Sequence, residues 1–236
     1  MIMYPAVILA GGLATRLRPL TETIPKALVD INGEPFIAHQ LRLLSKQGIT
    51  DIILSVGYRN EMIRDYVGDG KEFDVRVTYV EDGPQLLGTG GAIKNALKEM
   101  QTNSFFVLYG DSYLPCDYRA VQEFFINSDK FGLMTVFHNE DQWDTSNIEF
   151  SNHEIVAYDK KIKTSRMKYI DYGLGILTKE SFASVQEEEI FDLSFLYQLL
   201  LAKKRLAAYE IKERFYEAGS LTGIDGLKYY LERIGK

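Results

Sequence analysis

Two glycines and two cations stand close together near the start of the chain, where they could bind an anion. Gly11 and Gly12 directly follow an apolar run at residues 6–9, and Arg16 and Lys26 come soon after them. Neither glycine carries a Cβ, so the backbone can turn sharply there and come close to a ligand. Successive N–H groups in such a turn form a concavity that suits anions. We therefore predict a triphosphate-binding loop, with a tight structural turn carrying solvated cations as the alternative.

Two familiar phosphate-binding motifs do not explain this loop. A P-loop would close with glycine, lysine and serine or threonine, and this closing sequence is absent here. The dinucleotide-binding fingerprint needs a third glycine at a spacing that is also missing. The local charge still favours binding of an anion. Residues 16–26 contain three basic residues and one acidic residue, Glu22, whereas the whole chain has a net charge of −6.

The overall composition narrows the class of protein. With 236 residues, of which 46% are apolar and 25% charged, the chain is long enough for one large α/β domain. Its negative net charge argues against a general role in binding nucleic acid or membrane surfaces. The single cysteine, Cys116, excludes an internal disulfide and a thiolate metal cluster. We find no signal peptide and no apolar run of membrane-spanning length, so we expect a cytoplasmic protein.

Strand-like and helix-like stretches alternate in the first half of the chain. Apolar runs predict strands, and apolar residues at helical spacing predict helices, with Asn60 as the cap of one helix. This alternation predicts an α/β fold with a Rossmann-like, doubly wound, mostly parallel (mixed) sheet flanked by helices. The expected strands are 6–9, 51–56, 75–80 and 104–109, and the expected helices run from Pro35 to Gly48, from 60 to 67 and from 90 to 100.

The second half has shorter elements and a less regular rhythm. Its expected strands are 131–138, 147–150, 154–158, 172–178 and 206–211, and its expected helices are 118–126, 191–202 and 221–234. No Pro- or Ser-rich linker marks a boundary, so we interpret residues 116–236 as an extension of the same sheet and residues 1–236 as a single domain. A separate second domain is the alternative.

A carboxylate follows the fourth expected strand. Asp111 comes directly after residues 104–109 in the sequence Tyr-Gly-Asp. In open α/β sheets ligands bind beyond the carboxyl ends of the strands, and both this turn and the opening glycine loop follow such ends. A carboxylate there can hold Mg²⁺, which prefers oxygen ligands and substrate phosphates. The alternative is a turn aspartate that accepts bonds from nearby N–H groups.

The opening loop also resembles a family signature. From Gly11 to Lys26 the chain follows the pattern Gly-Gly-x-Gly-Thr-Arg-Leu-x-Pro-Leu-Thr…Pro-Lys of the sugar-1-phosphate nucleotidyltransferases, and departs from it only at Ala14, where glycine is usual. The resemblance implies in-line attack by a sugar 1-phosphate oxygen on the α-phosphorus of an NTP, which gives an NDP-sugar and pyrophosphate. It implies catalytic roles for Arg16, on the departing pyrophosphate, and for Lys26, on the α-phosphoryl charge.

The resemblance further implies which residues hold the nucleotide. A glycine-rich turn at residues 87–93, by itself a close-packed helix start, resembles the family turn that lies against the nucleobase and ribose. Just upstream, Glu81 and Asp82 stand where the family reads the base edge. A carboxylate accepts paired N–H bonds and guanine offers two donors on one edge, so GTP is favoured, with a uracil or thymine base left open. The implied nucleotide-binding residues are Leu9, Ala10, Gly11, Gly12, Thr15, Glu81, Gly88 and Thr89.

The metal and sugar sites are implied in the same way. Asp111 matches the family's metal-binding aspartate, and Glu217 stands where a second metal carboxylate is expected, so the implied cofactor is Mg²⁺. Asp159 and Lys160 resemble the pair that binds sugar hydroxyls and the sugar phosphate, although a charged hairpin end is the plainer interpretation. Residues 169–175 resemble the Asn-x-Gly stretch of the sugar pocket. The implied sugar-phosphate residues are Asp159, Lys160, Asp171 and Gly173, so that residues 1–115 mainly bind the nucleotide and 116–236 the sugar phosphate.

Several substrates and one other class of function stay open at this stage. Heptose-1-phosphate guanylyltransferases look closest, followed by mannose-1-phosphate guanylyltransferases and by muramate- or glucose-1-phosphate uridylyltransferases. A phosphocholine cytidylyltransferase should show an aromatic cage, which we do not find. A non-catalytic nucleotide-sensing subunit is the alternative of another class. The expected partners are an NTP and a sugar 1-phosphate, without nucleic acid or membrane, and a homo-oligomer stays open. Trp143 is interpreted as a loop anchor rather than a substrate cover.

Overall fold

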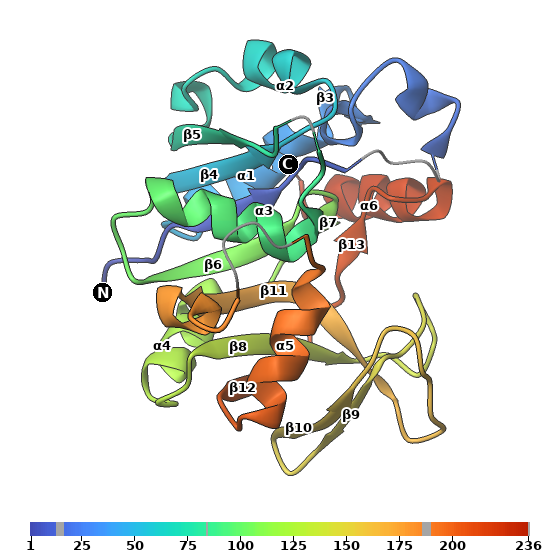
Figure 1. The fold of residues 1–236 in the computed structure, drawn as a ribbon. Coiled ribbons are helices and arrows are strands. Elements are labelled where there is room, and N and C mark those ends of the chain that lie inside the picture. The colour runs from blue at the N-terminus through green and yellow to red at the C-terminus, as the bar shows by residue number, and fades with distance from the viewer. Residues whose placement is uncertain (13–16, 84, 186–189, 236) are drawn as a thin grey trace.

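One mixed β-sheet forms the centre of the molecule (Figure 1). The computed structural model describes residues 1–12, 17–83, 85–185 and 190–235. In this part of the chain nine strands join in the order β10-β9-β11-β6-β1-β4-β5, with β8 paired to β11 and β12 paired to β8. The strands are β1 (Ala6–Leu9), β4 (Asp51–Val56), β5 (Arg76–Glu81), β6 (Ser104–Tyr109), β8 (Gly132–His138), β9 (Ile148–Ser151), β10 (Glu154–Tyr158), β11 (Tyr169–Thr178) and β12 (Leu206–Ile211).

The strands of the first half run parallel, with β1 in the middle. β4 and β6 both pair with β1 in parallel, on its two sides, and β5 continues the parallel sheet beyond β4. β11 is antiparallel to both β6 and β8, and so joins the second half of the chain to the first. The expected Rossmann-like, mostly parallel mixed sheet is confirmed.

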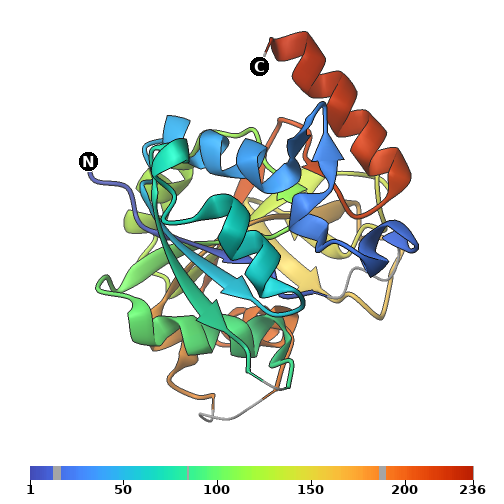
Figure 2. The same cartoon turned by 90° about the horizontal axis from the view of Figure 1, so that it is seen from above.

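Helices cover both faces of the sheet. Successive side chains of a strand point to opposite sides, and those of β1 are apolar on both, so both faces must be covered. On one face α1 (Phe36–Lys46), α2 (Asn60–Val67) and α4 (Tyr118–Ile126) enclose a core that contains Ala6 and Ile8 of β1. On the other face α3 (Gly88–Ala96) and α5 (Leu193–Ala202) enclose a second core that contains Val7. Figure 2 shows α1 and α2 on one side of the sheet and α3 on the other.

The last helix lies outside these two layers. α6 (Leu221–Ile234) packs Ile224, Leu227 and Leu231 against a third core. This core includes Ile31 of the small hairpin β2 (Asp30–Ile31)–β3 (Glu34–Pro35), which lies beside α6 in Figure 2.

A second two-stranded ladder brings a late part of the chain to the fourth parallel strand. β7 (Ser112–Tyr113) pairs with β13 (Tyr216–Glu217), and Ser112 stands opposite Glu217. The last strand therefore lies next to the turn that carries Asp111.

Some element ends differ from the expectations. Asn60 does not cap α2: it is the first helical residue, preceded by Arg59 in a left-handed conformation (φ 53°), and no side chain caps this helix. The helix expected from residue 90 begins at Gly88, and α5 begins at Leu193, because the Asp192 carboxylate accepts a bond from the Ser194 N–H at 2.8 Å and so caps it. The start of α5 thus depends on a cap contact that hydrophobic spacing does not encode.

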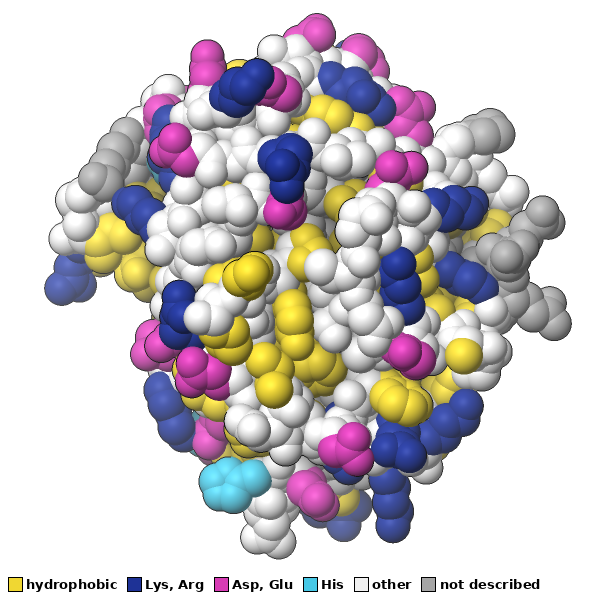
Figure 3. Space-filling view, turned by 90° about the vertical axis from the view of Figure 1, so that its left-hand side faces the viewer, with side chains coloured by type: hydrophobic (Ala, Val, Ile, Leu, Met, Phe, Trp, Pro, Cys, Tyr) yellow, Lys and Arg dark blue, Asp and Glu magenta, His cyan; other side chains and the backbone are white. Residues whose placement is uncertain are grey.

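Figure 3 shows the edge of the molecule where the parallel strands begin, opposite to their carboxyl ends. Hydrophobic side chains gather in the middle of this face, with acidic and basic side chains around them. Among the helices of the described ranges, none combines the length and the apolar character needed to cross a membrane.

Candidate active site

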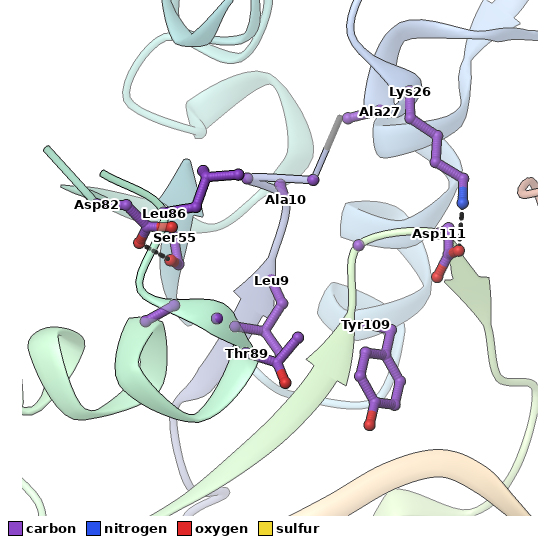
Figure 4. Close-up of a pocket in the computed structure, with 15 residues that line it drawn as sticks. Leu9, Ala10, Lys26, Ala27, Ser55, Asp82, Leu86, Thr89, Tyr109 and Asp111 are labelled. Carbon is purple, nitrogen blue, oxygen red and sulfur yellow. Dashed lines mark hydrogen bonds and ion pairs between the residues drawn. The ribbon is translucent and has the colours of Figure 1, made fainter. Parts of the chain in front are cut away.

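The pocket that we call the main pocket lies at the carboxyl end of β1, at the point where the strand order of the sheet reverses. β1 ends at Leu9, and the chain pairs next with β4 on one side and later with β6 on the other, which is the place where open α/β sheets bind ligands. A cavity of about 250 Å³ opens there (Figure 4). Its lining includes eight residues expected from the sequence, namely Leu9, Ala10, Gly11, Gly12, Lys26, Gly88, Thr89 and Asp111. Ser55, Asp82, Leu86 and Tyr109 also line it, and of these only Asp82 drew attention in the sequence.

Glycine is required where two strand ends meet under this pocket. Gly110 donates its N–H to the Leu9 carbonyl at 3.0 Å. A Cβ on Gly110 would collide with that same backbone carbonyl and with the Cα of Ala10. The turn after β6 therefore packs directly on the end of β1, which places Asp111 beside the glycine loop.

Lys26 and Asp111 meet at one end of the main pocket. Their side chains point toward one another in Figure 4 and form an ion pair between Nζ and Oδ2. The side chains are 17% and 25% exposed, so both charges can still reach a bound ligand.

Glu217 reaches the same place from the late strand β13. Its carboxylate accepts bonds from the Gly219 N–H and, at 2.5 Å, from the Ser220 hydroxyl. A Cβ on Gly219 would lie 2.6 Å from Glu217 Oε2, 2.7 Å from Lys26 Nζ and 3.1 Å from Asp111 Oδ2. Three charged side chains thus converge on one point, and Gly219 is the residue that leaves them room.

The two carboxylates have the chemistry that a magnesium ion needs. Asp111 and Glu217 supply hard oxygen donors, and a carboxylate has more acceptor positions than these contacts use. Among the described residues, no group of three or more His, Cys, Asp or Glu side chains could hold a metal. Mg²⁺ is commonly held by one or two carboxylates together with substrate phosphates and waters, so this pair fits it.

The opposite end of the pocket contains Asp82 rather than Glu81. Glu81 points outward and forms an exposed ion pair with Arg64 at 2.8 Å. Asp82 lines the pocket and accepts a bond from the Ser55 hydroxyl at 3.5 Å, as Figure 4 shows. Burial raises the pKa of Asp82, although bonds from the Leu87 backbone and Ser55 oppose this shift. The structure therefore does not bring Glu81 into the pocket, and its neighbour occupies that wall.

The second glycine turn supports a wall of the pocket by close packing. Gly88 has a φ of +72°, and a Cβ there would lie 2.5 Å from the Phe191 carbonyl oxygen. That carbonyl also accepts the Gly90 N–H at 2.9 Å. Thr89 donates its hydroxyl to Asp192 at 3.0 Å and accepts the Leu193 N–H at 2.8 Å. The glycines thus hold residues 191–193 against the start of α3, a role that only the alternative interpretation of this turn anticipated.

Lys160 and Asp171 come together on the second half of the sheet. Lys160 Nζ lies 3.3 Å from the Tyr109 hydroxyl and 3.6 Å from an Asp192 carboxylate oxygen. Asp171 accepts the Gly173 N–H at 3.0 Å, and the Tyr158 hydroxyl lies 3.4 Å from its other oxygen. Burial raises the pKa of Asp171, and the positive charge of Lys160 is the largest influence that opposes this. Because Tyr109 lines the main pocket, its contact with Lys160 places that cation at the edge of the pocket.

Asp159 is separated from these residues. Its carboxylate accepts the N–H groups of Lys161 and Ile162 at 2.7 and 2.9 Å, and these bonds lower its pKa. It borders a second cavity of about 920 Å³, shared with Tyr158 and Gln198, and not the main pocket. The plainer interpretation of Asp159, a turn residue, describes its contacts.

Residues 13–16 of the opening loop lie outside the described part of the chain. They include Ala14, the expected nucleotide-binding residue Thr15 and the expected catalytic residue Arg16. Trp143, in contrast, lies in the described part of the chain. The Arg214 Cζ lies 3.3 Å from the centroid of its ring, a contact that matches the expected loop anchor.

Comparison with known proteins decides the family. The family model described as Nucleotidyl transferase matches residues 5–187, which is more than half of the chain. The chain belongs to this family. The expectation of a nucleotidyltransferase enzyme is thereby confirmed. The matched range contains Lys26 and Asp111 but ends before Glu217.

This nucleotidyl transferase has one relative of similar length and one that is longer. It is 33% identical over 217 residues to D-glycero-alpha-D-manno-heptose 1-phosphate guanylyltransferase of Campylobacter jejuni, covering 91% of this chain and 94% of the relative. It is 43% identical over 244 residues to a mannose-1-phosphate guanyltransferase of Debaryomyces hansenii, covering 98% of this chain and 65% of that longer protein. HddC of Yersinia pseudotuberculosis, solved in complex with GMP-PN, has a TM-score of 0.81 and 28% identity, over 97% of this chain and all of that one.

Proposed function

We propose that the protein transfers a guanylyl group from GTP to a sugar 1-phosphate, giving a GDP-sugar and pyrophosphate. A heptose 1-phosphate is the first candidate sugar and mannose 1-phosphate the second, in line with the activities for which the Campylobacter and Debaryomyces relatives are named. The observation that carries the proposal is the convergence of Lys26, Asp111 and Glu217 at Gly219, at one end of a pocket lined by the glycine loop.

The reaction needs positioning and charge stabilisation more than proton transfer. A phosphate monoester has a second pKa of about 6, so the attacking sugar phosphate is mostly dianionic at neutral pH and needs no general base. Lys26, at the pocket end, would stabilise the charge that develops on the α-phosphoryl group. We keep Arg16 as the cation for the departing pyrophosphate, on the strength of its place in the family signature.

Asp111 and Glu217 would hold Mg²⁺. Bound there, the ion would neutralise charge on the phosphate oxygens. Lys26 now pairs with Asp111, so we infer that Lys26 exchanges this carboxylate for the phosphate when substrate enters. The chain's own residues thus offer two charge arrangements, one without ligand and one with it.

The preference for GTP is supported by Asp82. Guanine is the nucleobase that offers two adjacent N–H donors on one edge, and one carboxylate can accept both. Asp82 lies across the main pocket from the cation and carboxylate at the other end (Figure 4). We therefore move the base-reading role from Glu81, which pairs with Arg64, to Asp82.

The sugar phosphate would lie between the two halves of the sheet. Lys160 is the candidate cation for the phosphate, and Asp171 and Gly173 form the neighbouring wall. Asp159 keeps only its turn contacts in this proposal. On this assignment residues 1–115 mainly bind the nucleotide and residues 116–236 mainly the sugar phosphate, within one domain. As part of the proposal we place the reaction in the cytoplasm and its product in cell-surface polysaccharide synthesis.

A substrate panel tests this proposal. Pyrophosphate release is measured with each of GTP, ATP, UTP, CTP and dTTP against heptose, mannose, glucose and N-acetylmuramate 1-phosphates and phosphocholine, with and without Mg²⁺. We expect turnover with GTP and a heptose or mannose 1-phosphate that EDTA abolishes. Faster turnover with UTP or CTP would replace the substrate assignment. No turnover with any pair would contradict the proposed reaction.

A further inference from the structure

A buried glutamine lies directly under the turn that carries Asp111. Gln40 of α1 is 1% exposed. Its side-chain nitrogen donates to the Tyr109 carbonyl at 3.0 Å and to the Ser112 carbonyl at 2.9 Å. Both hydrogens of one amide are therefore used on the two carbonyls that bracket Gly110 and Asp111.

The other end of the same amide has no partner. Gln40 Oε1 is buried and accepts no hydrogen bond from any residue that the structure describes. Rotating the amide by half a turn would aim this oxygen at two carbonyl oxygens, which cannot donate, so the observed orientation is fixed. Burying an acceptor without a partner is unfavourable, so the two bonds to the turn are the contacts that hold this amide in place.

The turn is held on its other sides by backbone contacts. Gly110 donates to the Leu9 carbonyl at 3.0 Å, and Ala218 donates to the Asp111 carbonyl at 2.8 Å. Ser112 pairs with Glu217 across the β7–β13 ladder. A shift of the turn would therefore move both carboxylates, Asp111 directly and Glu217 through the ladder.

We propose that Gln40 is a positioning residue for the metal-binding carboxylates, although it touches neither of them. It fixes the 109–112 turn at both ends, so that Asp111 and Glu217 keep a separation suited to a divalent cation. This inference rests on the proposed function, because it takes these two carboxylates as the metal ligands. Outer residues that orient metal ligands typically change metal affinity by about 10- to 100-fold when removed.

The chain contains a matched control for this role. Gln122 of α4 is 0% exposed and also bonds two backbone groups, donating to the Ile2 carbonyl at 2.9 Å and accepting the Tyr4 N–H at 2.8 Å. Replacing it removes the same kind of buried bonds without touching the 109–112 turn. It thus separates a general loss of stability from a specific effect on the carboxylates.

The test compares Gln40→Met, Gln40→Glu and Gln122→Met with the unchanged protein, each as the full chain below its melting temperature. Binding of Mn²⁺ alone is followed by electron paramagnetic resonance, and hydrogen exchange is followed at the Gly110 and Ala218 amides. We expect Gln40→Met to weaken Mn²⁺ binding by about tenfold or more and to speed exchange at both amides. Gln40→Glu keeps the side-chain size but places a carboxylate against two carbonyl oxygens. It should therefore bind Mn²⁺ no more tightly than Gln40→Met does. Gln122→Met should bind Mn²⁺ within about twofold of the unchanged protein.

Several results would overturn the inference. Mn²⁺ affinity that stays within about twofold in both Gln40 variants would remove the positioning role, and so would an equal loss in Gln122→Met. If the unchanged protein bound no Mn²⁺, the metal part of the proposed function would fail. The exchange rates would then decide alone whether Gln40 holds the turn, and unchanged rates at Gly110 and Ala218 would reject that as well.

Discussion

Lys26 Nζ and Asp111 Oδ2 form an ion pair across the end of the main pocket. The cation thus occupies the carboxylate that a metal would use, and Glu217 adds a second carboxylate beside the pair. On the proposed function, entering phosphates would offer Lys26 a stronger anionic partner and would free Asp111 for the metal. The pair would then link binding of the triphosphate to binding of the metal.

Replacing Lys26 separates these two events. Lys26→Met should lower turnover by about 100- to 1,000-fold, because a preorganised charge at the phosphoryl group is lost. The same variant should bind Mn²⁺ at least as tightly as the unchanged protein, since Asp111 loses a competing cation. Arg18→Met, at an exposed neighbouring cation, should keep its turnover within about twofold. Pyrophosphate release and Mn²⁺ titration measure the two effects, and a Lys26 variant with near-normal turnover would contradict the assignment.

Asp82→Asn tests the nucleobase. Because asparagine has one acceptor oxygen where aspartate has two, it cannot take the two parallel N–H bonds of guanine, and kcat/KM for GTP relative to UTP should fall by about 10- to 100-fold. Glu81→Gln should leave the ratio unchanged, because Glu81 pairs with Arg64 at the surface. Burial raises the pKa of Asp82 and the base needs the ionised carboxylate, so kcat/KM for GTP should decline as the pH falls through that raised pKa. Asp82→Asn should lose this decline. If the variant and the unchanged protein had the same pH profile of kcat/KM, Asp82 would not be the residue that binds the base.

Lys160→Ala tests the sugar-phosphate end. Loss of a cation that meets a phosphate should raise KM for the sugar 1-phosphate by about tenfold or more, with little change in KM for GTP. The adjacent exposed Lys161 supplies the matched variant, Lys161→Ala, which should behave as the unchanged protein. Initial rates with each substrate varied in turn distinguish the two constants. Equal effects of the two variants would point to general electrostatics instead.

Asp171→Asn should change stability in a way that depends on pH. Burial raises the pKa of Asp171 above its ordinary value of 3.8, so the folded state binds the proton more tightly than the unfolded state does. The favourable contribution of the neutral acid is fully present below the ordinary pKa and is lost as the pH rises through the raised one. Asparagine carries no charge, so the variant should melt at a higher temperature at neutral pH, and the gain should vanish in acid. A gain that grew in acid would have the wrong sign.

Gly110→Ala tests the close approach of two strand ends. A Cβ at Gly110 would collide with the Leu9 carbonyl, so β1 and the 109–112 turn must move apart, at a cost of about 2–4 kcal/mol in the free energy of unfolding. Gly12→Ala, where no atom of the described residues lies within 4 Å of the added carbon, should change stability by less than about 1 kcal/mol. Urea unfolding of both variants gives the comparison, and equal losses would contradict the packing argument.

The parallel half of the fold could be predicted from the sequence. Its strands are continuous apolar runs, and the apolar residues of its helices recur at helical spacing. It also led to Lys26 and Asp111, since both stand in short motifs that follow strand ends. Asp82 and Glu81 could not be separated, because adjacent strand-end residues point in opposite directions and the register is set by pairing of β5 with β4.

The contacts between distant segments could not be foreseen. Gln40 reads in the sequence as one polar residue inside a helix, and only the packing of α1 under β6 gives its amide two carbonyls to hold. Gly88 suggested a ligand, whereas its φ and its missing Cβ are also needed by the Phe191 carbonyl. Asp159 matched a family pair, yet the turn after β10 directs its carboxylate to its own backbone.

The ladder between Ser112 and Glu217 has a consequence for the order in which the molecule becomes competent during its synthesis. A chain leaves the ribosome from its N-terminus, so the glycine loop, Lys26 and Asp111 emerge long before Glu217 does. The parallel strands around β1 need nothing beyond residue 109 to pair with one another. On the proposed function, the pair of carboxylates is therefore complete only after residue 217 has joined the fold.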